Sequence, residues 1–218
     1  RRPQRVPKGY FCMKSIFIDA GLEGDKEYNS HGFRCKEVDD LDFDNYILFV
    51  GCSHTTGIGV TIKQSYPYQV AKKLKCDYYN LGVGGGGIDA LEHNLLAWFT
   101  LYDKPPKYIV CQWPDYARYM KQLPNYANIT PAGNWTDEEF LVEADYPLQV
   151  KEELVYRLCR ILAPCPIIDV RYKGLWIGSA DSSVIWHTRD DRGTDNEHPG
   201  PISHKKTTQK ILEFLESR

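Results

Sequence analysis

The chain has 218 residues, 42% of them apolar and 26% charged, the balance of an ordinary globular protein. At roughly 100–200 residues per domain, this length favours one domain, large enough to fold without a metal or disulfides. The net charge of −2 argues against a nucleic-acid partner bound through bulk charge. No apolar run approaches the roughly 20 residues that span a bilayer, so we expect no membrane partner.

The seven cysteines include no Cys-x-x-Cys pair and no histidine at zinc-ligand spacing. Several lie inside apolar runs, as Cys111 does, where a buried thiol packs as a small hydrophobic group. We therefore expect free thiols, a reducing compartment such as the cytoplasm, and no metal. The chain starts at Arg1 rather than Met, which leaves a removed leader or a viral origin open.

The first ten residues carry four positive charges and two prolines, so we expect residues 1–27 to form an arm and lead-in and residues 28–218 one domain. Beyond the arm, short apolar runs alternate with segments of helical spacing. In chain order we predict a strand at 46–50, helix 64–74, strand 77–83, helix 88–102, strand 107–113, one or two helices within 135–162 with a helix start at 136–139, strand 166–171, a short strand 184–187 and helix 205–217.

This alternation of strands and helices predicts an α/β fold with a parallel sheet covered by helices on both faces. In such sheets ligands bind outside the carboxyl ends of the strands. The residues that follow each predicted strand are therefore the candidates for chemistry.

The first predicted strand leads into Gly51-Cys-Ser53-His54. A serine at a strand-to-helix turn has an exposed hydroxyl near the backbone N–H groups of a helix N-terminus, which suits a nucleophile with oxyanion donors. Taken alone, Ser53 is more simply explained as a helix cap.

The next two strand ends carry possible donors. Residues 82–87 form a glycine-dense loop whose N–H groups can approach a ligand closely. It fits a dinucleotide fingerprint formally, but no acidic residue ends a strand about twenty positions later. Gln112 at the third strand end could place its amide over the same crevice. Trp113 and Arg118 could line a polar pocket, although the indole of Trp113 could equally pack in the core.

Asp195 and His198 lie three residues apart on a turn before the last predicted helix. The carboxylate can fold back and orient the imidazole, as in the general-base half of a serine triad. Alone, the two residues are more simply explained by turn hydrogen bonds. Together with the serine, the glycine loop and the amide, however, they fall on one rim of the sheet.

From about Tyr28 onward the pattern resembles the SGNH (GDSL-type) serine hydrolases, including members encoded by bacteriophages. The resemblance implies a flavodoxin-like α/β/α sandwich of three layers, with a mostly parallel sheet of about five strands, and metal-free hydrolysis of esters, often acetyl groups on carbohydrates. The matching segments are Asn29-Ser-His-Gly32-Phe-Arg34, Gly51-Cys-Ser53, Asn80-Leu-Gly-Val-Gly-Gly85 and Asp195-Asn-Glu-His198-Pro-Gly.

The chain departs from the family pattern in two places. Cys52 stands where the family's Gly-Asp-Ser has aspartate. The family's Gly-x-Asn-Asp block is absent, which leaves Gln112 as the nearest amide to replace the asparagine that donates to the oxyanion.

We therefore expect a serine esterase that removes an O-acyl group, most often acetyl in this family, from a carbohydrate or a similar small substrate, without a cofactor. Ser53 would attack the carbonyl, His198 would take its proton and Asp195 would orient His198. The N–H groups of Ser53 and Gly85, with the Gln112 amide, would hold the oxyanion. Candidate substrate contacts are Arg34, His54, Trp113 and Arg118, although His54 is more simply explained by a local hydrogen bond. His31, His93, His187 and His204 are expected to be surface or turn residues.

Three alternatives stay open. An acyltransferase would use the same triad but exclude water from the pocket. A non-catalytic carbohydrate-binding or structural module would keep the fold, and the missing asparagine favours it. A nucleotide-binding protein would use the glycine loop.

Overall fold

The computed structural model describes Phe17 and residues 27–114, 118–122, 129–132, 145–172 and 184–218. Nearly all of the predicted arm lies outside these residues, as does the predicted helix start at 136–139. Phe17 itself is 5% exposed and packs edge-on against Phe33, with ring centroids 5.5 Å apart, so the lead-in contributes a side chain to the core.

A five-stranded parallel sheet forms the centre of the molecule, in the strand order β2-β1-β3-β6-β7. This order confirms the predicted flavodoxin-like topology, in which the chain turns back across β1 and leaves a crevice between β1 and β3. The strands are β1 (Tyr46–Gly51), β2 (Asp77–Gly82), β3 (Ile109–Trp113), β6 (Ile167–Tyr172) and β7 (Ile185–His187).

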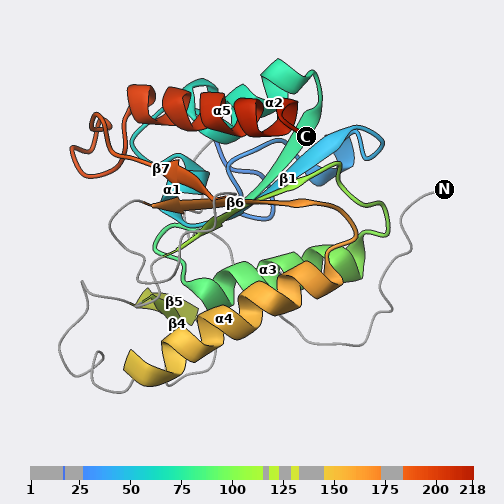
Figure 1. Cartoon of the computed structure of the whole chain (residues 1–218), viewed down its shortest axis with the longest axis vertical. Coiled ribbons are helices and arrows are strands. Elements are labelled where there is room, and N and C mark those ends of the chain that lie inside the picture. Colours follow the sequence, from blue (N-terminus) through green and yellow to red (C-terminus); the bar gives the residue numbers. More distant parts are fainter. Residues whose placement is uncertain (1–16, 18–26, 115–117, 123–128, 133–144, 173–183) are drawn as a thin grey trace.

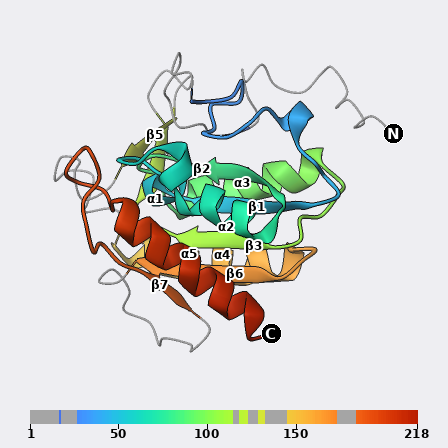
Figure 2. The same ribbon diagram turned by 90° about the horizontal axis from the view of Figure 1, so that it is seen from above.

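Two helical layers enclose the sheet, so the fold is the three-layer α/β/α sandwich that the family resemblance implied (Figure 1). One layer holds α2 (Tyr66–Leu74) and α5 (Pro201–Glu216), which cross the sheet side by side (Figure 2). The other layer holds α3 (Ile88–Leu101) and α4 (Asp145–Leu162). Within the described part of the chain, no helix combines the length and hydrophobicity needed to cross a membrane.

Both faces of the sheet are apolar, which explains the unbroken apolar run of β1. Leu48 and Val50 face the layer of α3 and α4, and Ile47 and Phe49 face the layer of α2 and α5. All four are at most 1% exposed. Burying such a side chain fully contributes about 1.5–3 kcal/mol each, which makes this central strand a principal source of stability.

The remaining elements are short. The helices α1 (Ser53–Thr56), η1 (Val38–Asp40) and η2 (Ile62–Gln64) are single turns. An antiparallel pair of strands, β4 (Tyr119–Gln122) and β5 (Ile129–Ala132), forms a separate sheet that the sequence did not predict. Neither strand alternates apolar and polar residues, so only their pairing defines them.

The last helix begins at Pro201, before its predicted start at 205. Proline is favoured in a first helical turn, where a missing N–H breaks no helical bond. The carboxylate of Asp191 then accepts hydrogen bonds from the free N–H groups of Ile202 (2.9 Å) and Ser203 (2.8 Å). Asp191 thus ties the loop before α5 to the start of that helix.

Replacing Asp191 by Ala should lower the free energy of unfolding by about 1–2 kcal/mol, because two N–H groups lose their acceptor. Urea denaturation monitored by circular dichroism measures this. The matched control is Asp44→Ala, which removes a carboxylate whose side chain is 81% exposed and should change stability by less than about 0.5 kcal/mol. Equal effects of the two variants would contradict the capping role.

Candidate active site

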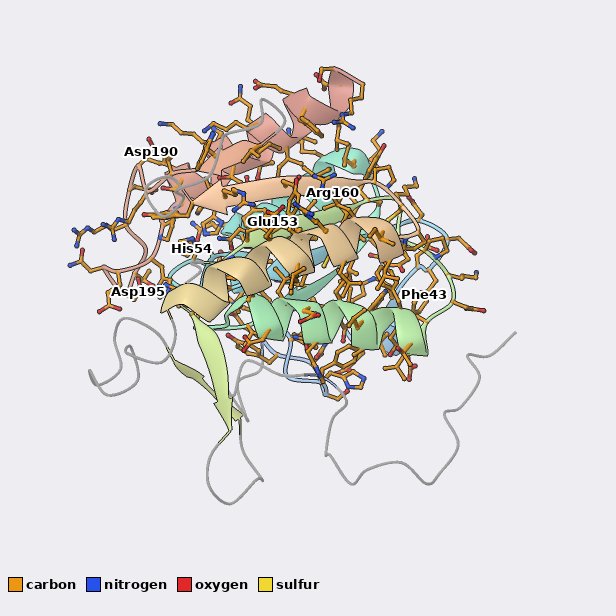
Figure 3. All side chains as sticks on the ribbon, turned by 60° about the horizontal axis from the view of Figure 1, so that its bottom comes forward. Phe43, His54, Glu153, Arg160, Asp190 and Asp195 are labelled. Atoms are coloured by element: carbon orange, nitrogen blue, oxygen red, sulfur yellow. The ribbon has the colours of Figure 1, made fainter. Side chains whose placement is uncertain are left out.

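The candidate residues meet at one end of the sheet, where β1, β2 and β3 reach their carboxyl ends. His54 lies in α1, the single turn after β1, and the turn that holds Asp195, just before α5, lies on the same side of the molecule (Figure 3). The ring centroids of His54 and His198 lie 5.9 Å apart. The structure therefore brings the serine segment and the Asp-x-x-His turn together.

Ser53 is the first residue of α1 and is buried, with 4% of its surface exposed, whereas its place at a strand end predicted an exposed hydroxyl. Cys52 occupies the N-cap position, and its side chain makes no capping bond, so the helix-cap interpretation of Ser53 is wrong. Because Ser53 lies in the first turn, its own N–H has no partner within the helix. The serine thus combines a hydroxyl with a nearby backbone donor.

The strand ends hold α1 in place through contacts that leave no room for larger residues. A Cβ at Gly82 would lie 2.6 Å from the backbone nitrogen of Thr56, so only glycine permits this approach. Asn80, at the end of β2, donates from Nδ2 to the carbonyl of Thr55 (2.9 Å) and accepts from the N–H of Gly82 (3.0 Å). The family-like segment 80–85 therefore fixes α1. Gly85 itself has a φ of 71°, a conformation that favours glycine.

Gln112 lies under α1 and is 1% exposed. Its Oε1 accepts hydrogen bonds from Thr55 Oγ1 (2.9 Å) and Cys52 Sγ (3.3 Å). The side-chain oxygen of Gln112 is thereby bound to α1. Cys52, which stands at the family's aspartate position, also contributes to this contact.

Asp195 and His198 form the predicted pair, with His198 Nδ1 and Asp195 Oδ2 2.6 Å apart. The other carboxylate oxygen accepts from the N–H groups of Glu197 and His198, each at 3.1 Å. Partial burial raises the pKa of Asp195, but these hydrogen bonds outweigh it and hold that pKa below its usual value. The carboxylate is therefore ionised and aligned with the ring at neutral pH.

The turn that carries this pair is docked on the segment that follows α1. Thr194 donates its N–H to the carbonyl of Gly59 (2.8 Å). Gly59 has a φ of 83°, and a Cβ there would lie 2.9 Å from Asp195 Oδ1. The approach of the two loops therefore requires glycine at this position.

Arg34 holds the same segment from the other side. Its guanidinium, 9% exposed, donates to the carbonyls of Gly57 and Val60 (2.8 Å to Val60) and from Nε to Glu27 (2.8 Å). These donors are used within the fold, so the prediction of Arg34 as a substrate contact does not fit the structure. Its role is to shape residues 57–60, on which the Asp-x-x-His turn rests.

For Trp113 the structure selects the core position rather than the pocket. Its side chain points to the α3 and α4 layer, is 2% exposed, and donates from Nε1 to Asp169 (2.9 Å). Because successive residues of a strand face opposite sides, Gln112 points toward α1 and Trp113 into the core. Arg118, in contrast, lies close enough to His54 for its charge to lower the pKa of that histidine.

Two histidines expected at the surface, His187 and His204, are instead fully buried beside the site. The ring of His187 lies 5.2 Å from that of His54 and 5.6 Å from that of His204. The sequence could have predicted the burial of His204, because His204, Thr207, Thr208 and Ile211 have the spacing of one buried helix face. His93 is exposed, as expected.

Burial holds these imidazoles neutral. It lowers the pKa of His187 to about 3 and that of His204 to about 4. Burial, followed by the charges of His187 and His198, lowers the pKa of His54 well below its usual value. Among the residues that the structure describes, no three His, Cys, Asp or Glu side chains are arranged to hold a metal ion.

These shifts predict an acid-sensitive fold. An unfolded histidine binds a proton below about pH 6.5, whereas folded His187 and His204 bind one only near their lowered pKa values. The part of the free energy of unfolding that depends on these two neutral histidines is therefore fully present above pH 6.5. For each histidine it falls by about 1.4 kcal/mol per pH unit as the pH drops toward 4. Urea denaturation across pH 4.5–7.5 measures this slope.

The variant His204→Phe should flatten this pH dependence, since it removes one titrating group, whereas His93→Ala, at an exposed position, should leave the slope unchanged. A slope that is the same in all three proteins would show that the buried imidazoles do not cause the acid sensitivity.

No family profile matches the chain, and no curated protein matches its sequence. Solved structures are similar in fold. An acetyl xylan esterase from the rumen bacterium Butyrivibrio proteoclasticus is 17% identical, with a TM-score of 0.50 over 79% of this chain and 64% of that one. A family 2 carbohydrate esterase with a carbohydrate-binding domain, from Corynascus thermopiles (Myceliophthora fergusii), is 14% identical, with a TM-score of 0.50 over 79% of this chain and 66% of that one.

A lipolytic protein of the G-D-S-L family from Desulfitobacterium hafniense is 11% identical, with a TM-score of 0.49 over 78% of this chain and 99% of that one. The chain spans slightly less than two thirds of the two carbohydrate esterases. At these identities the likeness to them shows a common fold, which is the one that the resemblance to SGNH hydrolases implied.

Proposed function

We propose that this protein is a serine esterase of the SGNH type that hydrolyses an O-acyl ester. The substrate we propose is an acetyl ester on a carbohydrate. The observation that carries the proposal is the Asp195–His198 pair, joined at 2.6 Å and docked on the segment that follows Ser53. The fold shared with an acetyl xylan esterase and a family 2 carbohydrate esterase supports the choice of substrate class.

In this mechanism Ser53 Oγ attacks the carbonyl carbon of the ester while His198 Nε2 takes the hydroxyl proton. The tetrahedral intermediate collapses to an acyl-serine, and His198 returns the proton to the leaving alcohol oxygen. Water then attacks the acyl-serine with His198 again as the base, which releases the acid and restores the serine. The carboxylate of Asp195 accepts from Nδ1–H and stabilises the imidazolium formed in each step.

The developing oxyanion would be held by the N–H groups of Ser53 and Gly85 and by the amide of Gln112. The contacts of Gln112 Oε1 with Thr55 and Cys52 support this role, because they fix the orientation of the side-chain amide. A donor fixed before the reaction stabilises charge without reorganisation. Arg118, close to His54, remains the candidate for contact with the alcohol part of the substrate.

The first test is hydrolysis of p-nitrophenyl acetate and acetylated xylooligosaccharides by the wild type and Ser53→Ala. Loss of the nucleophile should lower kcat by at least about 10³-fold. The matched control is Ser217→Ala, at an exposed position near the end of α5, which should keep wild-type activity.

Undiminished activity in Ser53→Ala would refute the mechanism. Acyl transfer to an added sugar without hydrolysis would identify an acyltransferase with the same triad. If the wild type shows neither turnover nor labelling of Ser53 by a fluorophosphonate, the fold serves binding rather than catalysis.

The oxyanion role of Gln112 predicts a distinct defect. Gln112→Glu keeps an oxygen to accept from Thr55 and removes the amide donor, so kcat should fall by about 10²–10³-fold with little change in KM. Circular dichroism and thermal unfolding would verify that the variant is folded. Activity within about threefold of the wild type would remove Gln112 from the oxyanion site and leave the triad intact.

A further inference from the structure

The residue after the nucleophile occupies an unusual place in this site. His54 belongs to α1, and its ring lies between the catalytic turn and the interior of the protein. Its Nδ1 is buried and has no hydrogen-bond partner in the described part of the chain. Ring packing therefore holds this side chain in place, with no hydrogen bond at that nitrogen.

Aromatic side chains from neighbouring strands support the ring from behind. Tyr172, at the end of β6, lies 4.9 Å from the ring of His54, with the planes at 62°. His187, in β7, lies 5.2 Å away. His187 is itself fixed by a hydrogen bond between its Nδ1 and Thr207 Oγ1 of α5. The ring of His54 therefore rests on side chains that belong to the rigid sheet and helix.

On its other side the ring of His54 meets His198. The two ring planes are nearly perpendicular, at 89°, with centroids 5.9 Å apart, which is a favourable edge-to-face arrangement. Asp195 binds one nitrogen of His198, but a single hydrogen bond leaves the imidazole free to swing about it. A second, apolar contact limits that motion.

We infer that His54 is a positioning residue: its ring forms the wall that keeps the imidazole of His198 in the orientation set by Asp195. The inference rests on the proposed role of His198 as the base, and it replaces the earlier expectation that His54 touches substrate. A displacement of about 1 Å in a catalytic group can cost about 10²-fold in rate, so removing this wall should slow the reaction.

The charges around His54 suit this role. Five titratable or charged side chains surround it, each from a different part of the fold: Tyr172 of β6, His187 of β7, His198 of the catalytic turn, Arg118 ahead of β4, and His204 of α5. Burial and the four neighbours other than Tyr172 lower the pKa of His54, so the ring is uncharged at neutral pH. When His198 takes the serine proton, it therefore meets no like charge across the ring contact.

The test compares two replacements of His54 that separate the ring from its nitrogens. His54→Ala removes the wall, and kcat on p-nitrophenyl acetate should fall about 10- to 100-fold with KM within about twofold of the wild type. His54→Phe keeps a flat ring and should retain kcat within about threefold. The control is His93→Ala, at an exposed position of α3 on the opposite face of the sheet, which should be unchanged.

Three results would overturn the inference: equal loss of kcat in the Ala and Phe variants, no loss in either, or a rise in KM at constant kcat. A rise in KM at constant kcat would make His54 a substrate contact. If His54→Ala fails to fold by circular dichroism, His54→Leu takes its place, because leucine refills the volume without a flat ring and should show the same loss of kcat.

Nuclear magnetic resonance of the His198 Nδ1 proton separates this inference from the proposed function. That proton should be protected from exchange in the wild type and His54→Phe, and exchange rapidly in His54→Ala. Should the wild type hydrolyse no ester, the proposed function fails, yet this readout still decides whether His54 orders His198. Equal protection in all three proteins would overturn the inference.

Discussion

The contact between residues 57–60 and the turn 193–198 is the constraint on which the candidate site depends. The two segments meet through backbone atoms 135 residues apart in the sequence, where the N–H of Thr194 donates to the carbonyl of Gly59 at 2.8 Å. Arg34 secures the first segment by donating to the carbonyls at both its ends. Without this docking, a local Asp-His pair would have no fixed relation to a serine elsewhere in the fold.

The central sheet and the side chains at its strand ends fix the position of α1 behind this contact. β1 is buried on both faces and delivers Ser53 to the carboxyl edge of the sheet, while Asn80 and Gln112 of the flanking strands hydrogen-bond to the turn α1 from two sides. The Asn80 amide nitrogen and the Gln112 side-chain oxygen thus have partners within the fold, which avoids the cost of leaving them unpaired. The same buried bonds make the position of the serine insensitive to the loops around it.

Buried imidazoles beside the site link its geometry to pH. His187 and His204 stay neutral because burial penalises the charged form, and through His54 their packing reaches His198. Acid that protonates these rings would therefore weaken both the packing between α5 and the sheet and the support of the His198 ring.

The sequence by itself determined what depends on local pattern: the apolar run of β1, the order of strands and helices, and the Asp195–His198 pair, whose spacing of three residues needs only one turn. The tertiary structure alone decided which side of a strand each neighbour faces and which distant groups it meets. In the fold Gln112 points toward α1 and Trp113 packs in the core. Arg34 binds backbone carbonyls of the segment 57–60 instead of a substrate. The physical reason is that a buried polar side chain takes its role from partners far along the chain, and no local spacing encodes them.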